Sequence, residues 1–265
     1  MHCMNKLKPS LKTSILLKII GSEWSKLIIS SWAAHWAWEL LSHFEDCDIM
    51  ETVYDLRFQA PFTMQVVGGT SSGKSFFTKR LLTNAFQMIH PAPDRTIYCY
   101  GEWQPMFQEM KDVEFVRGLT ESLVSRENLH GHTCLVIDDL SDEVDEKLIG
   151  SLFSKLSHHR NISVIFLLNN LYYRGLKNMR DISLNTHYLV LFKTARDQSS
   201  VTTIARQMLG KNYKLMLSAY EDAVQQKYGY LLVDSKPATP DILRLRTKIF
   251  PGEATICYTN QHGKK

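Results

Sequence analysis

The sequence predicts an α/β fold with a mainly parallel central sheet flanked by helices, and two observations lead to this prediction. The first is a series of short runs in which nearly every residue is apolar, as expected of strands that are buried on both faces of a sheet. These runs occupy residues 62–67, 95–100, 133–138, 163–169 and 187–192. The second is the helical spacing of Phe77, Leu81, Ala85 and Met88 after the first run. That spacing indicates a helix whose apolar stripe faces the sheet.

A glycine-rich loop joins the first predicted strand to this helix. The text "VVGGTSSGKS" covers residues 66–75, with Gly68, four further residues, and then Gly73, Lys74 and Ser75. This is the spacing of a phosphate-binding loop, in which backbone N–H groups and the positive end of a helix hold an anion. Lys74 is expected to reach the β- and γ-phosphates of ATP, and the Ser75 hydroxyl is expected to ligate Mg²⁺. The expected nucleotide-binding residues are Gly68, Gly69, Thr70, Ser71, Ser72, Gly73, Lys74, Ser75 and Phe76.

Two adjacent carboxylates close the third predicted strand. In "CLVIDDL", Asp138 is expected to hold Mg²⁺ and Asp139 to activate a water molecule. The alternative is that these acids cap the next helix, since "SDEVDEK" resembles a helix start. The hydrolytic interpretation is favoured because the pair ends an apolar strand in a chain that already has a phosphate-binding loop.

The strand at residues 95–100 lies between the loop and Asp138 in sequence. It places Asp138 on the third predicted strand, as in P-loop NTPases of the additional-strand ATPase type. Nucleotide kinases and switch GTPases are disfavoured, and the guanine-reading N-K-x-D motif is absent from the sequence.

Polar residues near the fourth and fifth predicted strands are further candidates. Asn169 can hydrogen-bond an attacking water and the γ-phosphate, although Asn169 and Asn170 would equally suit an Asx turn that closes the strand. A guanidinium from a neighbouring subunit would stabilise transition-state charge in a ring-shaped ATPase. The candidates are Arg174, Arg180 and Arg196, and surface arginines are the competing interpretation for each.

Composition and cysteine spacing favour a folded, intracellular protein without a disulfide framework or a zinc site. The chain has 44% hydrophobic and 22% charged residues with a net charge of +4, which is typical of a folded protein and permits contact with a polyanion. The five cysteines are dispersed without a C-x-x-C pair, which argues against a disulfide framework or a zinc site and favours an intracellular protein. Only His158 and His159 are adjacent, which is a weak basis for metal binding.

The first fifty residues have a different character. They are rich in tryptophan and aliphatic residues, but their longest run without formal charge, Leu27 to Trp38, is far below the ~20 residues that span a bilayer. A helical, partly buried extension is expected, with a helix on a membrane surface as the alternative. Neither stable membrane insertion nor a secretory signal is expected.

Six segments of the sequence together resemble a known protein family. They are "GGTSSGKS", "CYGEWQPMF", "LVIDDL", "LFSKLSHHRNISVIFLLNNLYYRG", "RDISLNTHYLVLFKTARDQSSVTTIARQM" and "YGYLLVDSKPATPDILRLRTKIFPGE". From about Tyr54 to Glu253 the chain resembles the genome-packaging ATPases of Polinton (Maverick) elements and adintovirus-like viruses, which are similar to the poxvirus-type packaging ATPase and belong with the FtsK/HerA motors.

The resemblance implies a motor, forming a homo-oligomeric ring, that uses ATP and Mg²⁺ to pump double-stranded DNA into a capsid. By position it makes Lys74 and Ser75 the loop residues, Asp138 the metal acid and Asp139 the water-activating acid. Asn169 stands where the family more often has glutamine, and Ala195 precedes Arg196 where a proline is usual. Capsid proteins would be further partners, and the nucleus, cytoplasm or virion would be the location.

Three segments are therefore expected: an N-terminal helical extension over residues 1–53, a P-loop ATPase domain over 54–253, and a tail over 254–265. Two alternative functions remain open on the same core. One is a DNA helicase or repair ATPase, and the other is a host-captured ATP-binding protein without motor activity.

Overall fold

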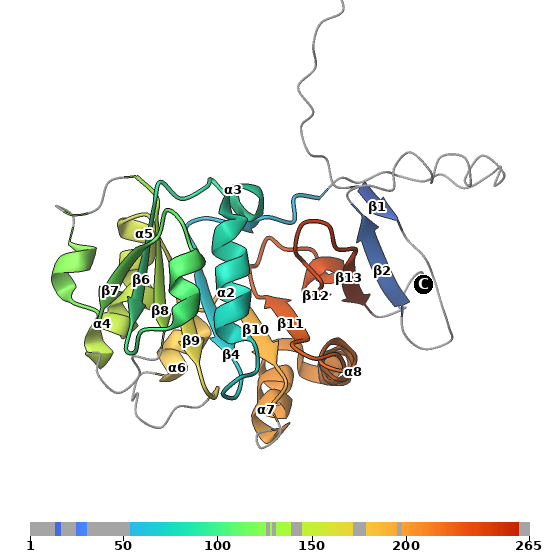
Figure 1. Ribbon diagram of the computed structural model, residues 1–265. Helices are drawn as coiled ribbons and strands as arrows, with labels where there is room; N and C mark the ends of the chain where they lie inside the picture. The colour runs from blue at the N-terminus through green and yellow to red at the C-terminus, as the bar shows by residue number, and fades with distance from the viewer. Residues whose placement is uncertain are drawn as a thin grey trace, which may run out of the picture.

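The computed structural model describes residues 54–125, 128, 131–138, 145–171, 179–194 and 198–259, together with two short strands nearer the N-terminus. Within these ranges, eleven strands form one sheet in the order β1-β2-β13-β12-β11-β10-β4-β9-β8-β6-β7 (Figure 1). A separate two-stranded sheet pairs β3 (Phe58–Gln59) with β5 (Ile89–His90) in parallel.

One half of the large sheet is parallel. Its strands are β7 (Glu114–Arg117), β6 (Arg95–Tyr100), β8 (Thr133–Asp138), β9 (Ile162–Leu168), β4 (Thr63–Val67) and β10 (Tyr188–Phe192). Every neighbouring pair in this series is parallel. The strands β4, β8, β9 and β10 are buried at every residue, as a sheet covered on both faces requires. The predicted α/β fold is confirmed, and these six strands form the parallel sheet that was predicted.

The other half of the sheet is antiparallel and was not predicted. It consists of β11 (Tyr230–Asp234), β12 (Leu245–Thr247), β13 (Thr255–Thr259), β2 (Ser25–Ser30) and β1 (Ser14–Leu16), each antiparallel to its neighbour. The strand β13 lies in the interval that the sequence analysis set apart as a tail, yet it hydrogen-bonds to β12 and continues the sheet.

The N-terminal region differs from the expected helical extension wherever the structure describes it. Residues 14–16 and 25–30 are strands, and residues 25–29 of β2 pair with the whole of β13. The sequence of β2, "SKLIIS", contains two β-branched isoleucines, which favour extended backbone. The remaining residues from 1 to 53 lie outside the described part of the chain.

Helices cover both faces of the sheet and enclose two large apolar cores. The described α-helices are α2 (Lys74–Thr83), α3 (Ala85–Met88), α4 (Glu146–Ser151), α5 (Ser157–His159), α6 (Met179–Leu184), α7 (Gln198–Leu209) and α8 (Tyr213–Ala223). A π-helical segment (Leu152–Leu156) joins α4 to α5. Short 3₁₀ segments lie at Pro105–Glu109, Glu121–Val124, Gly210–Asn212 and Asp241–Leu243. None of the helices in the described ranges is long and apolar enough to cross a lipid bilayer.

The helix α2 crosses the front of the sheet in Figure 1. Its Phe77 and Leu81 belong to the core on that face, while α7 contributes Val201 and Ile204 to the core on the opposite face. The predicted helix from Phe77 to Met88 is interrupted at Asn84, whose side-chain amide donates to the Arg80 carbonyl at 2.8 Å. Such local side-chain bonding competes with helix continuation, so a second short helix follows.

Candidate functional site

The glycine-rich loop lies between β4 and α2, as predicted. Gly68 N–H donates to the Leu168 carbonyl at 3.1 Å, which fixes the start of the loop against β9. Gly73 has φ +111°, a value that only glycine adopts readily. A Cβ on Gly68 would lie 2.6 Å from both Phe192 Cβ and Ser72 Oγ. The loop therefore requires glycine at both positions of the motif.

The Lys74 side chain folds across the loop. Its Nζ donates to the carbonyl oxygens of Gly68 at 2.7 Å and Gly69 at 3.1 Å, and to Asn169 Oδ1 at 3.0 Å. Asn169 follows the last residue of β9, so this contact joins the loop to the end of the neighbouring strand. The structure thus brings together Lys74 and Asn169, two of the predicted site residues, at one edge of the sheet.

The predicted metal-binding pair is also brought together. Ser75 Oγ donates to Asp138 Oδ2 at 3.4 Å, and the hydroxyl of Tyr98 donates to the same oxygen at 2.6 Å. The Asp138 residue is only 5% exposed. Burial and the neighbouring Asp138 carboxylate raise the pKa of Tyr98, which keeps its hydroxyl protonated as a donor.

Sheet topology explains how Asp138 reaches the loop. The strand β9 lies between β4 and β8, and all three are parallel, so their carboxyl ends meet at one edge. Asp138 ends the third predicted strand, as expected. However, the strand that separates Asp138 from the loop in space is β9, whereas residues 95–100 form β6 on the far side of β8.

The loop fits a phosphate chain. Ser72 Oγ is buried and has no hydrogen-bond partner among the described residues, which leaves a polar atom available to a ligand. A Cβ on Gly69 would meet nothing within 4 Å, so the loop is open at that point. The first turn of α2 contains no acidic residue that would oppose an anion at the positive end of the helix.

The donor set also fits Mg²⁺. A hydroxyl and a carboxylate are the hard oxygen ligands that this ion prefers, and Ser75 and Asp138 present them side by side. Elsewhere in the described residues there is no cluster of three histidine, cysteine or acidic side chains that could hold a metal. The His158 ring instead packs edge-on against His187, with centroids 5.4 Å apart.

The first helix described after Asp138 is capped by another acidic residue. The next described helix, α4, begins at Glu146, and its N-cap is Asp145, whose side chain accepts from the Lys147 N–H at 2.9 Å. Asp138 accepts hydrogen bonds from Ser75 and Tyr98.

Several predicted residues are not placed. Asp139, Arg174 and Arg196 lie outside the described part of the chain. Arg180 belongs to α6, of which the backbone at that position is described and the side chain is not. Their assigned roles stay predictions.

Two residues beside the loop were missed by the sequence analysis. Tyr98 lies within β6, and no motif connects it to Asp138, because their contact depends on the lateral pairing of β6 with β8. Tyr228 precedes β11 and packs over the loop, where a Cβ on Gly73 would lie 3.1 Å from its ring. The sequence feature that could have indicated Tyr228 is an aromatic residue beside a glycine in "KYGY".

Comparison with known proteins gives distant structural similarities. No protein-family model matches the chain, and no curated protein does either. The chain is similar to ATPases 2 and 3 of EssC from Geobacillus thermodenitrificans, with 12% identity, 81% of this chain and 42% of that chain covered, and a TM-score of 0.43. It is similar to the pCW3 conjugation coupling protein TcpA in a monomer form with ATPγS, with 14% identity, coverage of 79% and 62%, and a TM-score of 0.42.

A third similar structure is the cytoplasmic domain of the type VII secretion ATPase EccC from Thermomonospora curvata. The identity is 14%, the coverage is 81% of this chain and 27% of that chain, and the TM-score is 0.45. The chain thus spans less than two thirds of the length of each of these structures. At such identities and TM-scores the similarity shows nothing about the ligands or activity of this chain.

Proposed function

We propose that the chain is an ATPase of the FtsK/HerA type that couples ATP hydrolysis to translocation of double-stranded DNA. One observation carries the hydrolytic part: Lys74, Ser75, Asp138 and Asn169 converge where β4, β8 and β9 end. A phosphate-binding lysine, a pair of metal ligands and a polar amide are the parts from which P-loop ATPases assemble their site.

Each residue has a task in the proposed reaction. The loop N–H groups and Lys74 bind the phosphates, and Asn169 orients the attacking water. Ser75 and Asp138 would hold Mg²⁺, which neutralises phosphate charge when it is bound. Asp139 takes a proton from the water as its oxygen bonds to the γ-phosphorus, and the bond from that phosphorus to the ADP oxygen breaks. In a ring, Arg180 or Arg196 of a neighbouring copy stabilises the charge that develops.

The DNA part of the proposal rests on the resemblance of six sequence blocks to genome-packaging ATPases. On that basis the motor packages a viral or transposon genome into a capsid, with capsid proteins as partners and the nucleus, cytoplasm or virion as its location. A motor that moves any sequence is expected to bind the phosphate backbone, so its DNA affinity should fall with rising salt.

The test is DNA-stimulated ATP hydrolysis by the purified protein. Double-stranded DNA should raise the rate, and Lys74→Ala and Asp139→Asn should abolish hydrolysis. Lys79→Ala is the matched control, because Lys79 lies on the same helix and pairs with exposed Glu109. A wild-type protein that hydrolyses no ATP, with or without DNA, overturns the proposal.

Translocation needs its own readout. Displacement of a third strand from a triplex, without separation of the duplex strands, is the result expected of a duplex motor. Strand separation without triplex displacement would instead identify a helicase.

A further inference from the structure

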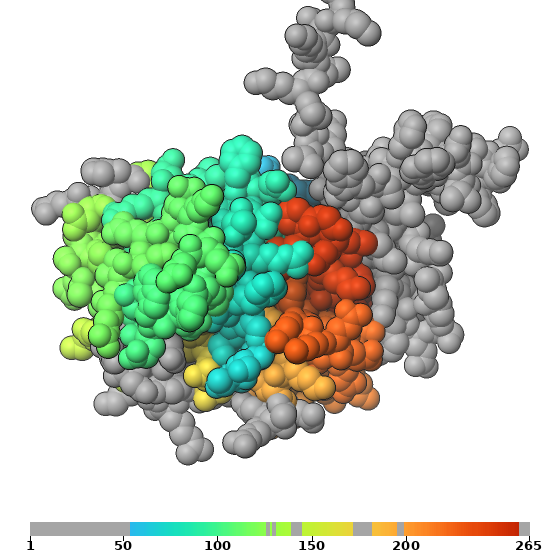
Figure 2. All heavy atoms as spheres, in the orientation of Figure 1, coloured from blue at the N-terminus to red at the C-terminus, as the bar shows by residue number. Residues whose placement is uncertain are grey.

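A cavity of about 610 Å³ opens beside the phosphate-binding loop. It is lined by the loop and the start of α2, the turn before β11 and the stretch around β12 and β13, together with Phe192 of β10 and Ala223 of α8. Gly73, Phe76, Gln226, Tyr228 and Lys248 are among the lining residues. Figure 2 shows the face on which cyan residues of α2 border the orange and red residues of the C-terminal part. A volume of this size is typical of sites for small molecules.

The cavity is continuous with the phosphate site but lies at its opposite end. The contacts of Lys74 with Asn169 and of Ser75 with Asp138 mark the end that faces β9 and β8. The cavity lies toward β10 and β11, which are on the other side of β4. Gly73 and Phe76 belong both to the loop region and to the cavity wall. A phosphate chain whose last phosphate faces β9 therefore directs its other end into the cavity.

Two aromatic rings are exposed along this path. Tyr228 is 51% exposed and Phe76 is 56% exposed, although large aromatic side chains usually bury most of their surface. Both line the cavity. Further inside, Phe250 packs edge-on against Phe77 and lies under the Arg80 guanidinium, which is 4.2 Å from its ring centroid. The inner wall is thus fixed by packing, while the two outer rings are exposed, and the Lys227 Nζ lies 4.9 Å from the centroid of the Tyr228 ring.

The backbone holds Tyr228 in this outward position. Its φ is +62°, a conformation that is rare for a bulky residue. The following Gly229 is required by the turn, because a Cβ there would lie 2.3 Å from the Ala223 carbonyl oxygen. Its N–H donates to the Gln226 carbonyl at 2.9 Å. The turn therefore presents an aromatic ring beside the loop at a conformational cost, which is typical of functional positions.

The chemistry of the walls matches a nucleoside. Aromatic faces bind bases by stacking, and the polar side chains of Gln226 and Lys248 on the cavity wall suit ribose hydroxyls. Lys227 and Lys248 also bring positive charge to a site that would hold an anionic nucleotide.

We infer that this cavity binds the base and ribose of the nucleotide, with Tyr228 and Phe76 stacking on the base. The inference rests on the proposed function, since it assigns the remaining part of the same ligand. It makes Tyr228, which lies outside the phosphate-binding loop in the sequence, a determinant of nucleotide affinity.

The experiment compares two ligands that share phosphates and differ in the nucleoside. Binding of ADP and of inorganic pyrophosphate, each with Mg²⁺, is measured by calorimetry on the full chain. In Tyr228→Ala and Phe76→Ala, ADP should bind about 5- to 100-fold more weakly, the range for loss of one base–aromatic stack. Pyrophosphate affinity should stay unchanged, and Tyr228→Trp should restore ADP binding.

Trp103→Ala is the matched control, because Trp103 is a half-exposed aromatic residue outside this cavity. If the Tyr228 variant folds poorly, Phe76→Ala still tests the inference, since alanine suits an exposed helical position. The inference is overturned if both alanine variants bind ADP as tightly as the wild type, or if pyrophosphate binds as tightly as ADP. Either result would leave the proposed phosphate site intact. Failure of the wild type to bind either ligand overturns the proposed function itself.

Discussion

The hydroxyl of Tyr98 donates a 2.6 Å hydrogen bond to Asp138 Oδ2, the oxygen that also accepts from Ser75. The tyrosine is buried on β6, and Asp138 ends the adjacent strand β8. A hydrogen bond to a charged acceptor is worth about 1.5–3 kcal/mol, so it can hold the carboxylate in one orientation. Tyr98 is thus a positioning residue for the proposed metal ligand.

Removing this hydroxyl should weaken the use of Mg²⁺. In Tyr98→Phe the ring is kept and the hydrogen bond is lost, so the Asp138 carboxylate can rotate away from Ser75. We expect the Mg²⁺ concentration for half-maximal ATP hydrolysis to rise several-fold, with a smaller change in the rate at saturating Mg²⁺. A titration of hydrolysis against Mg²⁺ measures both quantities.

Tyr100→Phe is the control for this change. Tyr100 lies on the same strand, directly opposite Asp138 in the register, and no hydrogen bond of its hydroxyl is seen among the described residues. The positioning role is refuted if both tyrosine variants show the same Mg²⁺ dependence as the wild type.

Asn169 should affect catalysis more than binding. Its Oδ1 accepts from Lys74 Nζ at 3.0 Å, at the end of the loop where the γ-phosphate is expected. In Asn169→Ala we expect kcat to fall at least 10-fold while the Kd for ATP changes less than about 3-fold, because the amide would act on the attacking water. Asn169→Gln should retain part of the activity.

Substitution of the neighbouring Asn170 distinguishes a catalytic role of these asparagines from a role in closing the strand. Asn170 Oδ1 is buried without a hydrogen-bond partner among the described residues, so Asn170→Ala removes no bond seen in the structure. If Asn170→Ala lowers kcat and Asn169→Ala does not, the catalytic amide is Asn170. If both variants lose stability and keep kcat, the asparagines only close the strand.

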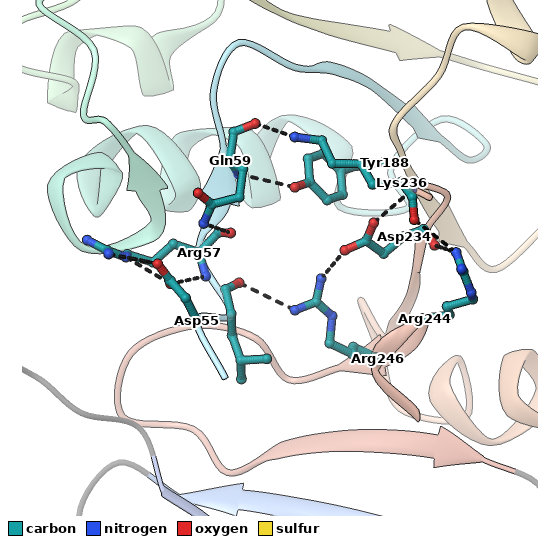
Figure 3. Close-up of polar contacts among 9 residues, drawn as sticks. Asp55, Arg57, Gln59, Tyr188, Asp234, Lys236, Arg244 and Arg246 are labelled. Carbon is teal, nitrogen blue, oxygen red and sulfur yellow. Dashed lines mark hydrogen bonds and ion pairs between the residues drawn. The ribbon is translucent and has the colours of Figure 1, made fainter. Parts of the chain in front are cut away.

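A buried ion pair between β11 and β12 should contribute to the free energy of unfolding. Arg246 Nη2 lies 2.9 Å from Asp234 Oδ2, and the two side chains are 5% and 6% exposed. Figure 3 shows Arg246 also directed toward the segment that enters β3, where its Nη1 donates to the Leu56 carbonyl at 3.4 Å. Arg246→Met leaves a buried carboxylate without its cation, so we expect a loss of about 3–5 kcal/mol in the free energy of unfolding.

Urea denaturation measures this loss, and a second substitution tests its cause. Asp234→Asn combined with Arg246→Met removes the uncompensated charge, so the double variant should recover part of the stability. The exposed pair Arg57–Asp55 offers the comparison, and Arg57→Met should cost less than about 1 kcal/mol. An unchanged deficit in the double variant would mean that the lost bond to Leu56, rather than the charge, sets the cost.

The parallel half of the fold could be predicted because its signals are local. Strands buried on both faces read as continuous apolar runs, and for this reason β6 and β8 begin and end at the predicted residues. The loop is equally local, since its glycines, Lys74 and Ser75 are consecutive. The proximity of Asp138 then follows from parallel strands ending at one edge.

The remaining features depend on contacts between distant segments. Pairing of β2 with β13 joins residues 25–29 to 255–259, and no local pattern specifies such a partner. The contact of Tyr98 with Asp138 requires the register of two strands, and the cavity beside Gly73 is closed by segments distant in sequence that meet only after folding. The tryptophan-rich and aliphatic composition of the first fifty residues likewise could not reveal that residues 25–30 extend a sheet.

Mild acid should destabilise the protein through His187. Its Nδ1 accepts from the Thr63 N–H at 3.0 Å, which requires that nitrogen to be unprotonated. Burial, with Lys236 and His158 nearby, lowers the pKa of His187 to about 4. An unfolded histidine titrates near ~6.5, so between these values the unfolded state binds more protons and stability rises with pH. We therefore expect the free energy of unfolding to decrease as the pH falls from about 6.5 to about 4.

His187→Asn tests this assignment, because an amide oxygen can accept the Thr63 bond and does not titrate. Its unfolding free energy, from urea curves at pH 4.5 and 7, should depend less on pH than that of the wild type. Some dependence should persist, since burial also lowers the pKa of His132. His159→Asn changes an exposed histidine and should leave the wild-type dependence in place. Equal pH dependence in all three proteins would show that protonation of His187 is not what weakens the fold.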